Sequence, residues 1–227
     1  MRTHAIIVAA GSGSRFGGPL PKQFLPLAGL PVLMHTVAGL RQALPDMTAT
    51  VVLAPSEVER WQSLCARHDF ASPEIALGGA TRFDSVKNAL GNIPAGCDIV
   101  LVHDGARPFA SSEMIGRLLQ VFDEEKAYGA IPAIAVTDSL RVMRGDGGSE
   151  SVDRSLFRAV QTPQAFRVDL LRDAYAKAPS DEGFTDDASV MEAAGYRNLR
   201  LVEGDSDNIK ITNPHDLAIA EAILSEK

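Results

Sequence analysis

The sequence is poor in cysteine, in cations and in long apolar runs, and each shortage excludes a class of protein. Cys65 and Cys97 form neither a CxxC pair nor a zinc-binding spacing, so neither a disulfide scaffold nor a zinc module is expected. No apolar stretch approaches the ~18 residues of a membrane helix. The apolar run before Gly11 is too short for the core of a signal peptide. We therefore expect a cytoplasmic protein with no membrane partner.

Lysine and arginine are also outnumbered. The chain has 22 Lys and Arg against 29 Asp and Glu, a formal net charge of −7, so it lacks the broad basic surface of a general nucleic-acid binder. Hydrophobic residues make up 45% of the 227 positions, enough to form a core. One domain spanning residues 1–227 is the expected organisation, and two smaller domains are the alternative.

Short β-branched runs alternate with helical patterns along the chain. The expected strands lie at 6–8, 50–53, 74–77, 99–102 and 130–136. The expected helices lie at 31–43, after a capping box of Ser56 and Glu59, from about Thr81, at 112–126, and after Asn213 as N-cap with Pro214 at the first position. This alternation predicts an α/β fold, a mainly parallel sheet with helices on both faces.

Residues 139–160 break this rhythm. They alternate in polarity, turn at Gly145-Asp146-Gly147-Gly148 and resume at Ser151, which predicts a protruding β-hairpin arm. Such an arm needs cover, and a second subunit could supply it. A surface loop is the alternative.

The strongest chemical signal is a glycine loop at 9–17, which reads AAGSGSRFG. Its backbone N–H groups can converge on phosphate oxygens, because glycine has no side chain in the way. The loop lacks the Gly-Lys-Ser/Thr end of a P-loop, and its glycine spacing differs from the Rossmann fingerprint. Arg15 and Lys22 add two cations, which suits a polyphosphate ligand. An ordinary glycine loop with surface charges is the alternative.

Two further segments fall where strands of a parallel sheet are expected to end. Gly78-Gly79 leads into a helix that carries Arg82 and Ser85, although Arg82 could instead pair with Asp84 or Glu74. Asp104 follows the fourth strand, at the edge where open α/β sheets bind ligands.

A lone carboxylate beside a triphosphate suits Mg²⁺, which uses few protein ligands. A turn contact between Asp104 and Arg107 is the alternative reading. His103 is not needed as a base in phosphoryl transfer. Lys210 stands between Ile209 and Ile211, and strand alternation would point it away from the face that those two residues bury.

Six segments occur together in one order: AAGxGxR, PKQFL, GGxxRxxSV, VHDxARP, QTPQ and DNIKIT. The set closely resembles the 2-C-methyl-D-erythritol 4-phosphate cytidylyltransferases of the non-mevalonate isoprenoid pathway. The match runs from about Ile6 to the C-terminal helix. The resemblance implies a Rossmann-like nucleotidyltransferase fold, a homodimer formed through the arm, and Mg²⁺-dependent transfer of CMP from CTP to a polyol phosphate.

The resemblance also implies roles for individual residues. The implied catalytic residues are Arg15, Lys22, Arg154 and Lys210, with Arg154 reaching into the partner's site. The implied nucleotide-binding residues are Ala9, Ala10, Gly11, Gly13, Gly79, Arg82 and Ser85. The implied acceptor-binding residues are Arg107, Ser139, Thr162 and Thr185. Asp104 is the implied metal ligand.

Two other functions remain open on the sequence. A related enzyme could activate another polyol phosphate, such as ribitol 5-phosphate, and would differ in the acceptor pocket near Ser139 and Thr185. A catalytically silent nucleotide-binding regulator could use the same scaffold. The presence of Arg15, Lys22, Asp104 and Lys210 together argues against the regulator, because binding alone does not require the full set of cations.

Overall fold

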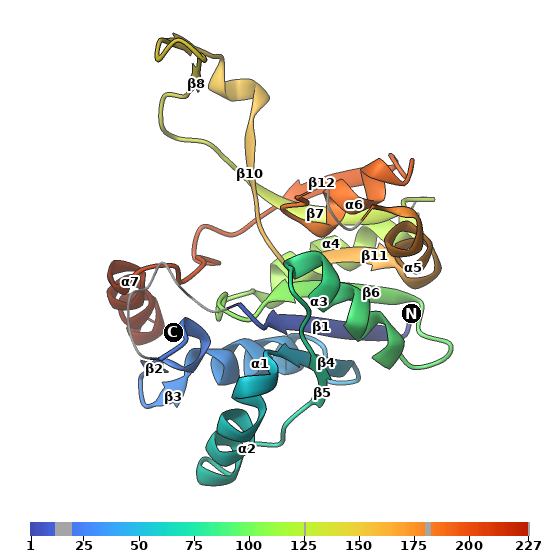
Figure 1. Cartoon of the computed structure of the whole chain (residues 1–227), viewed down its shortest axis with the longest axis vertical. Coiled ribbons are helices and arrows are strands. Elements are labelled where there is room, and N and C mark those ends of the chain that lie inside the picture. Colours follow the sequence, from blue (N-terminus) through green and yellow to red (C-terminus); the bar gives the residue numbers. More distant parts are fainter. Residues whose placement is uncertain (12–19, 125, 180–182, 227) are drawn as a thin grey trace.

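The computed structural model describes residues 1–11, 20–124, 126–179 and 183–226. A central sheet in this part of the chain has the strand order β10-β7-β11-β6-β1-β4-β5, and β12 pairs with β7 (Figure 1). The strands are β1 (Thr3–Ala9), β4 (Thr48–Leu53), β5 (Glu74–Leu77), β6 (Ile99–Asp104), β7 (Gly129–Ala135), β10 (Arg158–Val160), β11 (Gln164–Arg167) and β12 (Leu199–Glu203).

The centre of the sheet is parallel. β1 pairs in parallel with β4 and β6, and β4 pairs in parallel with β5, as the apolar runs predict. The strands that the sequence did not reveal lie on one side: β11 is antiparallel to β6 and β7, and β10 is antiparallel to β7. The predicted mainly parallel sheet is therefore confirmed, with an antiparallel insertion.

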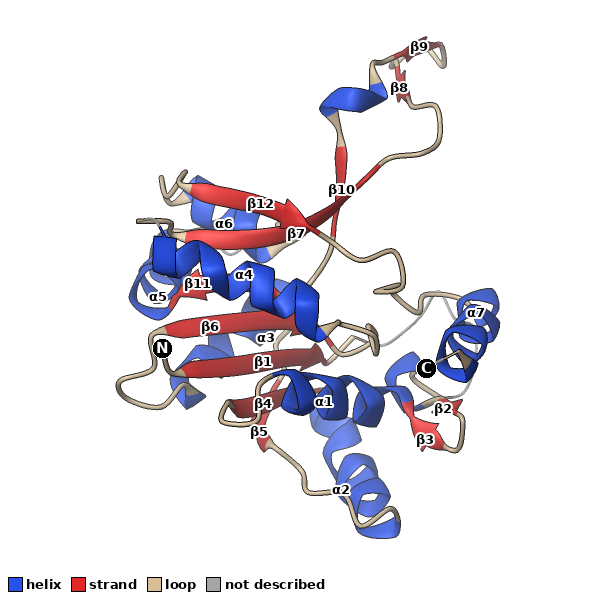
Figure 2. Ribbon diagram, turned by 180° about the vertical axis from the view of Figure 1, so that it is seen from behind, coloured by secondary structure: helices blue, strands red, loops and turns tan. Residues whose placement is uncertain are grey.

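Helices cover both faces of the sheet, as predicted. They are α1 (Val32–Ala43), α2 (Val58–Arg67), α3 (Arg82–Ala89), α4 (Ser112–Glu124), α5 (Val168–Lys177), α6 (Asp187–Ala193) and α7 (Pro214–Ser225). One hydrophobic layer joins β1 to α3, α5 and α6, and the other joins β1 to α1, α2 and α4. Figure 2 shows α1 and α4 on the face turned away in Figure 1. Alternate residues of β1 supply the two layers, for example Ile6 and Ile7.

Two of the expected helix starts have a capping box in the structure. Thr81 and Asp84 form a capping box at the start of α3, and Asn213 and Asp216 form another at α7. The capping box expected at Ser56 and Glu59 is wrong. Pro55–Glu57 forms a 3₁₀ turn instead, so α2 begins only at Val58 and has no side-chain cap.

The predicted hairpin arm is confirmed. β8 (Arg141–Met143) pairs antiparallel with β9 (Ser149–Ser151), and the arm extends away from the body of the molecule (Figure 1). Its residues are exposed, including the apolar Met143 at 71% and Leu156 at 81%. A second, smaller hairpin joins β2 (Pro26–Leu27) to β3 (Leu30–Pro31) and packs under α7. Within the described ranges, none of the helices has both the length and the apolar character needed to cross a bilayer.

Candidate active site

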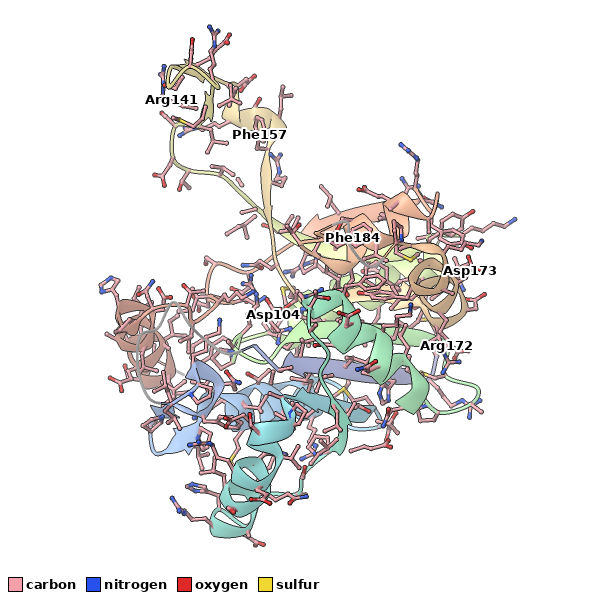
Figure 3. All side chains as sticks on the ribbon, viewed as in Figure 1. Asp104, Arg141, Phe157, Arg172, Asp173 and Phe184 are labelled. Atoms are coloured by element: carbon pink, nitrogen blue, oxygen red, sulfur yellow. The ribbon has the colours of Figure 1, made fainter. Side chains whose placement is uncertain are left out.

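A pocket of about 410 Å³ lies at the carboxyl ends of β1 and β6, beside the first turn of α3. Ligands bind at this edge of open α/β sheets. The predicted residues that line the pocket are Ala9, Ala10, Gly11, Lys22, Gly79, Arg82, Ser85, Asp104 and Lys210. Figure 3 labels Asp104 in the middle of the molecule. Gly13 and Arg15 lie outside the described residues.

The first part of the glycine loop is held by Gln23, a residue that sequence reasoning missed. Gln23 Nε2 donates to the carbonyl oxygens of Ala9 at 2.7 Å and Gly11 at 3.3 Å. Gln23 is 3% exposed and follows Lys22 in a 3₁₀ turn, Lys22–Phe24. These bonds keep Lys22 next to the end of β1. The signal was present in the PKQFL segment, where a polar residue stands directly before a buried phenylalanine.

The Gly78-Gly79 turn needs glycine because the chain after β5 passes the end of β4 and comes close to Ala10, the residue after β1. A Cβ on Gly78 would lie 2.3 Å from the Cβ of Ala10. Ser85 closes the turn: its hydroxyl accepts from the Gly79 N–H at 3.1 Å and donates to the Thr81 carbonyl at 2.8 Å. Ser85 therefore shapes the pocket wall, and its predicted contact with the base stays a prediction.

Three cations surround the carboxylate of Asp104. Oδ2 lies 2.8 Å from Lys210 Nζ and 3.4 Å from Arg107 Nε, and Oδ1 lies 3.9 Å from Arg82 Nε. Burial acts to raise the pKa of Asp104, but the three cations outweigh it and hold the pKa well below its usual range. Asp104 is therefore ionised. The three cations around it concentrate positive charge at this pocket, in a protein whose net charge is negative. The turn contact between Asp104 and Arg107 exists as one part of this cluster.

His103 lies behind Asp104 and is neutral. Burial lowers its pKa to about 4. The Arg107 carbonyl can only accept, so the single proton of the neutral ring lies on Nε2, and Nδ1 accepts from the Thr162 hydroxyl at 3.0 Å. The same hydroxyl accepts from the Asp104 N–H at 2.9 Å. Nε2–H of His103 then donates to the Arg107 carbonyl at 3.0 Å. Both ring nitrogens have protein partners, so His103 supports the end of β6 and is not placed to act as a base.

Lys210 reaches Asp104 from an irregular segment. The expectation of a strand around Ile209 and Ile211 is wrong, because residues 208–212 form no ladder and are fixed by separate bonds. Ile211 N–H donates to the Ala106 carbonyl at 2.9 Å, and Arg107 Nη1 donates to the Asn208 carbonyl at 2.8 Å. Ile211 is buried, and Lys210 Nζ faces the pocket.

Arg82 does not pair with either partner that the sequence suggested. Asp84 is engaged by Thr81 in the capping box, and Glu74 accepts from Asn92. Arg82 Nη2 instead lies 2.6 Å from Oδ2 of Asp187, at the start of α6. The two residues are 105 positions apart, so only the packing of α6 against α3 brings them together.

The comparisons with known proteins point to one family. The sequence profile of 2-C-methyl-D-erythritol 4-phosphate cytidylyltransferase matches residues 3–226. A protein of that name from Bacteroides thetaiotaomicron is 45% identical over 225 residues, which are 99% of this chain and all of the relative.

The chain belongs to the 2-C-methyl-D-erythritol 4-phosphate cytidylyltransferase family.

Solved structures agree with the fold of this cytidylyltransferase. The crystal structure of 4-diphosphocytidyl-2C-methyl-D-erythritol synthase from Anaerococcus prevotii is similar with a TM-score of 0.82 and 27% identity, covering 99% of this chain and 98% of that one. The 2-C-methyl-D-erythritol 4-phosphate cytidylyltransferase from Thermus thermophilus has a TM-score of 0.74 and 34% identity, covering 97% and 98%. The protein is thus a nucleotidyltransferase with the expected fold.

The residues predicted to bind the acceptor are not gathered in the cytidylyltransferase pocket. Arg107 and Thr162 lie behind Asp104, and Thr162 is 6% exposed. Ser139 and Thr185 are exposed, at the base of the arm and just before α6. Arg154 lies in the arm, where its guanidinium donates to the Thr137 carbonyl of the same chain. Their predicted roles stay predictions.

Asp104 is the described residue best placed to hold a metal. The described part of the cytidylyltransferase has no group of three or more His, Cys, Asp or Glu side chains arranged around one point. Lys210 and Arg107 both approach Oδ2, which leaves Oδ1 with only the 3.9 Å contact to Arg82. One accessible carboxylate oxygen fits Mg²⁺, because that ion keeps several waters and binds substrate phosphates.

Proposed function

We propose that this pocket is where the chain transfers CMP from CTP to 2-C-methyl-D-erythritol 4-phosphate and releases pyrophosphate. The observation that carries the proposal is the cluster of three cations on Asp104, beside the glycine loop at the carboxyl edge of the sheet. Membership of the cytidylyltransferase family supports the reaction. The acceptor's phosphate monoester attacks the α-phosphorus in line.

Charge neutralisation and alignment are the tasks of the site, because both reactants are anions. Lys22 lines the pocket from the turn after the glycine loop, and Lys210 lines it from the irregular segment before α7. We assign to Lys22, together with Arg15, the stabilisation of negative charge around the α-phosphate, and to Lys210, together with Arg154, the positioning of the attacking acceptor phosphate. No covalent intermediate is needed, and the neutral, fully partnered His103 fits that conclusion.

The proposed nucleotide-binding roles are supported by the lining of the pocket and, for Gly13, by the family resemblance alone. Backbone at Ala10, Gly11 and Gly79, with Ala9, Gly13, Arg82 and Ser85, would hold the nucleotide. Mg²⁺, when bound, would neutralise charge on the phosphate oxygens, and Asp104 would contribute Oδ1. Because the carboxylate is ionised at neutral pH, it needs no proton loss to act as a ligand.

The acceptor side is proposed to be completed by a second copy of the chain. The arm presents exposed apolar side chains, among them Val142, Met143 and Leu156, and these need cover. A homodimer through the arm at 139–160 would place Arg154 in the partner's site, opposite Ser139, Thr162 and Thr185. We also propose that residues 1–227 act as one domain and that the protein is cytoplasmic. The free thiols of Cys65 and Cys97 are compatible with a reducing compartment.

Pyrophosphate release tests the reaction and its rivals together. The purified protein is assayed with CTP, Mg²⁺ and either 2-C-methyl-D-erythritol 4-phosphate or ribitol 5-phosphate. We expect release with the first acceptor at a kcat/KM far above that with the second. A preference for ribitol 5-phosphate would identify the related enzyme. No release with either acceptor, from protein that still binds CTP, would favour the regulator.

A further inference from the structure

Asp187 is a fully buried carboxylate with a partner on each oxygen. Oδ2 accepts from Arg82 Nη2 at 2.6 Å, and Oδ1 accepts from the Tyr175 hydroxyl at 2.6 Å. Its exposed fraction is 0%. Burial raises the pKa of Tyr175 well above its usual value, so the phenol keeps its proton and donates it. The carboxylate is therefore fixed in one orientation.

A buried ion pair of this kind is a poor source of stability. Removing both charges from water costs about as much as their attraction returns, and apolar side chains of equal volume would pack as well. The pair of Arg82 and Asp187 therefore indicates that these residues hold other parts of the site in position. The contacts of each residue show which parts of the site it holds.

Arg82 connects Asp187 to the pocket. Its Nη2 binds Asp187, its Nε lies 3.9 Å from Asp104 Oδ1, and its side chain is 25% exposed on the pocket wall. One guanidinium thus bridges a carboxylate inside the pocket and a carboxylate outside it. A phosphate or cation that arrives at Asp104 changes the field on Arg82 directly.

Asp187 connects Arg82 to the segment 183–187, which carries the exposed Thr185. The start of α6 is held from the sheet by Gln164, whose Nε2 donates to Asp186 Oδ2 at 2.9 Å and whose Oε1 accepts from the Ala188 N–H at 3.0 Å. The segment is therefore fixed to β11 on one side and to α3 on the other.

Apolar packing adds to this attachment. Phe184, labelled in Figure 3, stacks on Phe83 of α3 with ring centroids 5.6 Å apart, and Phe83 stacks on Tyr175 at 4.7 Å. This packing does not depend on the charge of Asp187. Loss of that charge alone should leave the segment folded.

We propose that Asp187 is a positioning residue that couples the segment 183–187 to the nucleotide pocket through Arg82. A nucleotide and an acceptor phosphate then do not bind independently: each orders, through the Arg82–Asp187 pair, the side of the site that the other uses. The proposal rests on the proposed function in one respect, the place of Thr185 on the acceptor side. Coupling of this kind is reciprocal, so it can be read from the nucleotide alone.

The test measures the affinity of an unreactive CTP analogue, with a methylene group between the α- and β-phosphorus, by calorimetry with and without 2-C-methyl-D-erythritol 4-phosphate. In the wild type we expect the acceptor to change the analogue's Kd by about fivefold or more. In Asp187→Asn the acceptor should leave the analogue's Kd unchanged, so that the ratio of the two Kd values is about one. Arg82→Gln removes the same ion pair from the pocket side and should also abolish the coupling. This variant replaces Asp187→Asn in the test if Asp187→Asn fails to fold.

The matched control is Tyr175→Phe. It removes the other hydrogen bond of Asp187 and keeps the Arg82 pair and the ring stacking. We expect a lower unfolding midpoint with the wild-type coupling retained. Undiminished coupling in folded Asp187→Asn, or an equal loss in Tyr175→Phe, would overturn the proposal. An absence of coupling in a wild type that releases pyrophosphate would overturn it as well, and would leave the proposed function standing.

Discussion

Replacing Lys210 by methionine separates the chemistry of the pocket from the stability of the fold. Methionine keeps an unbranched side chain and removes the ammonium group that lies 2.8 Å from Asp104. Asp104 keeps Arg107 at 3.4 Å and Arg82 at 3.9 Å, so its carboxylate is not left without a cation. The segment that carries Lys210 is held by the bonds of Asn208 and Ile211, which the substitution does not touch.

The two expected effects differ in size. Loss of a preorganised charge at the reacting centre costs about 10²–10³ in kcat, or roughly 2.7–4 kcal/mol of transition-state stabilisation. The Lys210 side chain is 37% exposed, so solvent screens its pair with Asp104. The free energy of unfolding should therefore fall by about 1 kcal/mol or less. Lys210→Met should be nearly inactive and nearly as stable as the wild type.

Pyrophosphate release gives kcat and KM, and urea unfolding followed by circular dichroism gives the stability. Lys177→Met is the matched control, because Lys177 makes a 2.6 Å pair with Asp173 on the exposed face of α5, on a helix that does not line the pocket. Its kinetics should equal those of the wild type. A kcat for Lys210→Met within threefold of the wild type would refute the catalytic role. An equal loss of activity in Lys177→Met would refute the claim that Lys210 matters because it lines the pocket.

Three further changes test other parts of the account. Thr81→Ala removes the capping box of α3 and should lower the free energy of unfolding by about 1 kcal/mol in urea, where an unchanged midpoint would count against the cap. His103 has a pKa of about 4 in the fold against 6.5 in the open chain, so only the unfolded chain gains a proton as pH falls from 7 to 5. His103 should therefore contribute about 2 kcal/mol less stability at pH 5. The pKa of buried His4 is also lowered to about 4, so His4 should add a similar loss in urea unfolding, and equal stability at the two pH values would contradict both buried neutral rings. Leu156→Glu in the arm should turn a dimer into a monomer in analytical ultracentrifugation, and a persistent dimer would place the interface elsewhere.

Local patterns predicted the parts of the fold that local physics decides. The apolar runs at 50–53 and 99–102 became β4 and β6, because strands buried on both faces are nearly continuous in apolar residues. β11 escaped prediction because its four residues, Gln164–Arg167, include two polar side chains and no β-branched residue. The expected cap at Ser56 failed because Pro55 begins a 3₁₀ turn that holds Ser56 inside it.

The residues of the site likewise fall into those that local patterns place and those that only the packed fold brings together. Gly79 and Asp104 stand just after β5 and at the end of β6, so the parallel topology brings them to one edge, whereas Lys22 is held there by the hydrogen bonds of Gln23. The partner of Arg82 could not be foreseen, because Asp187 is 105 positions away and meets it only when α6 packs on α3. Likewise, the irregular segment that carries Lys210 has no periodicity from which its direction could be read.

A crystal structure of the protein with CTP and Mg²⁺ tests the central claim most directly. The account predicts the cytosine against Gly79 and Ser85 and the triphosphate between Lys22 and Asp104, with density for the metal at Asp104 Oδ1. A nucleotide bound in any other cavity, or a triphosphate that makes no contact with Lys22, would contradict it.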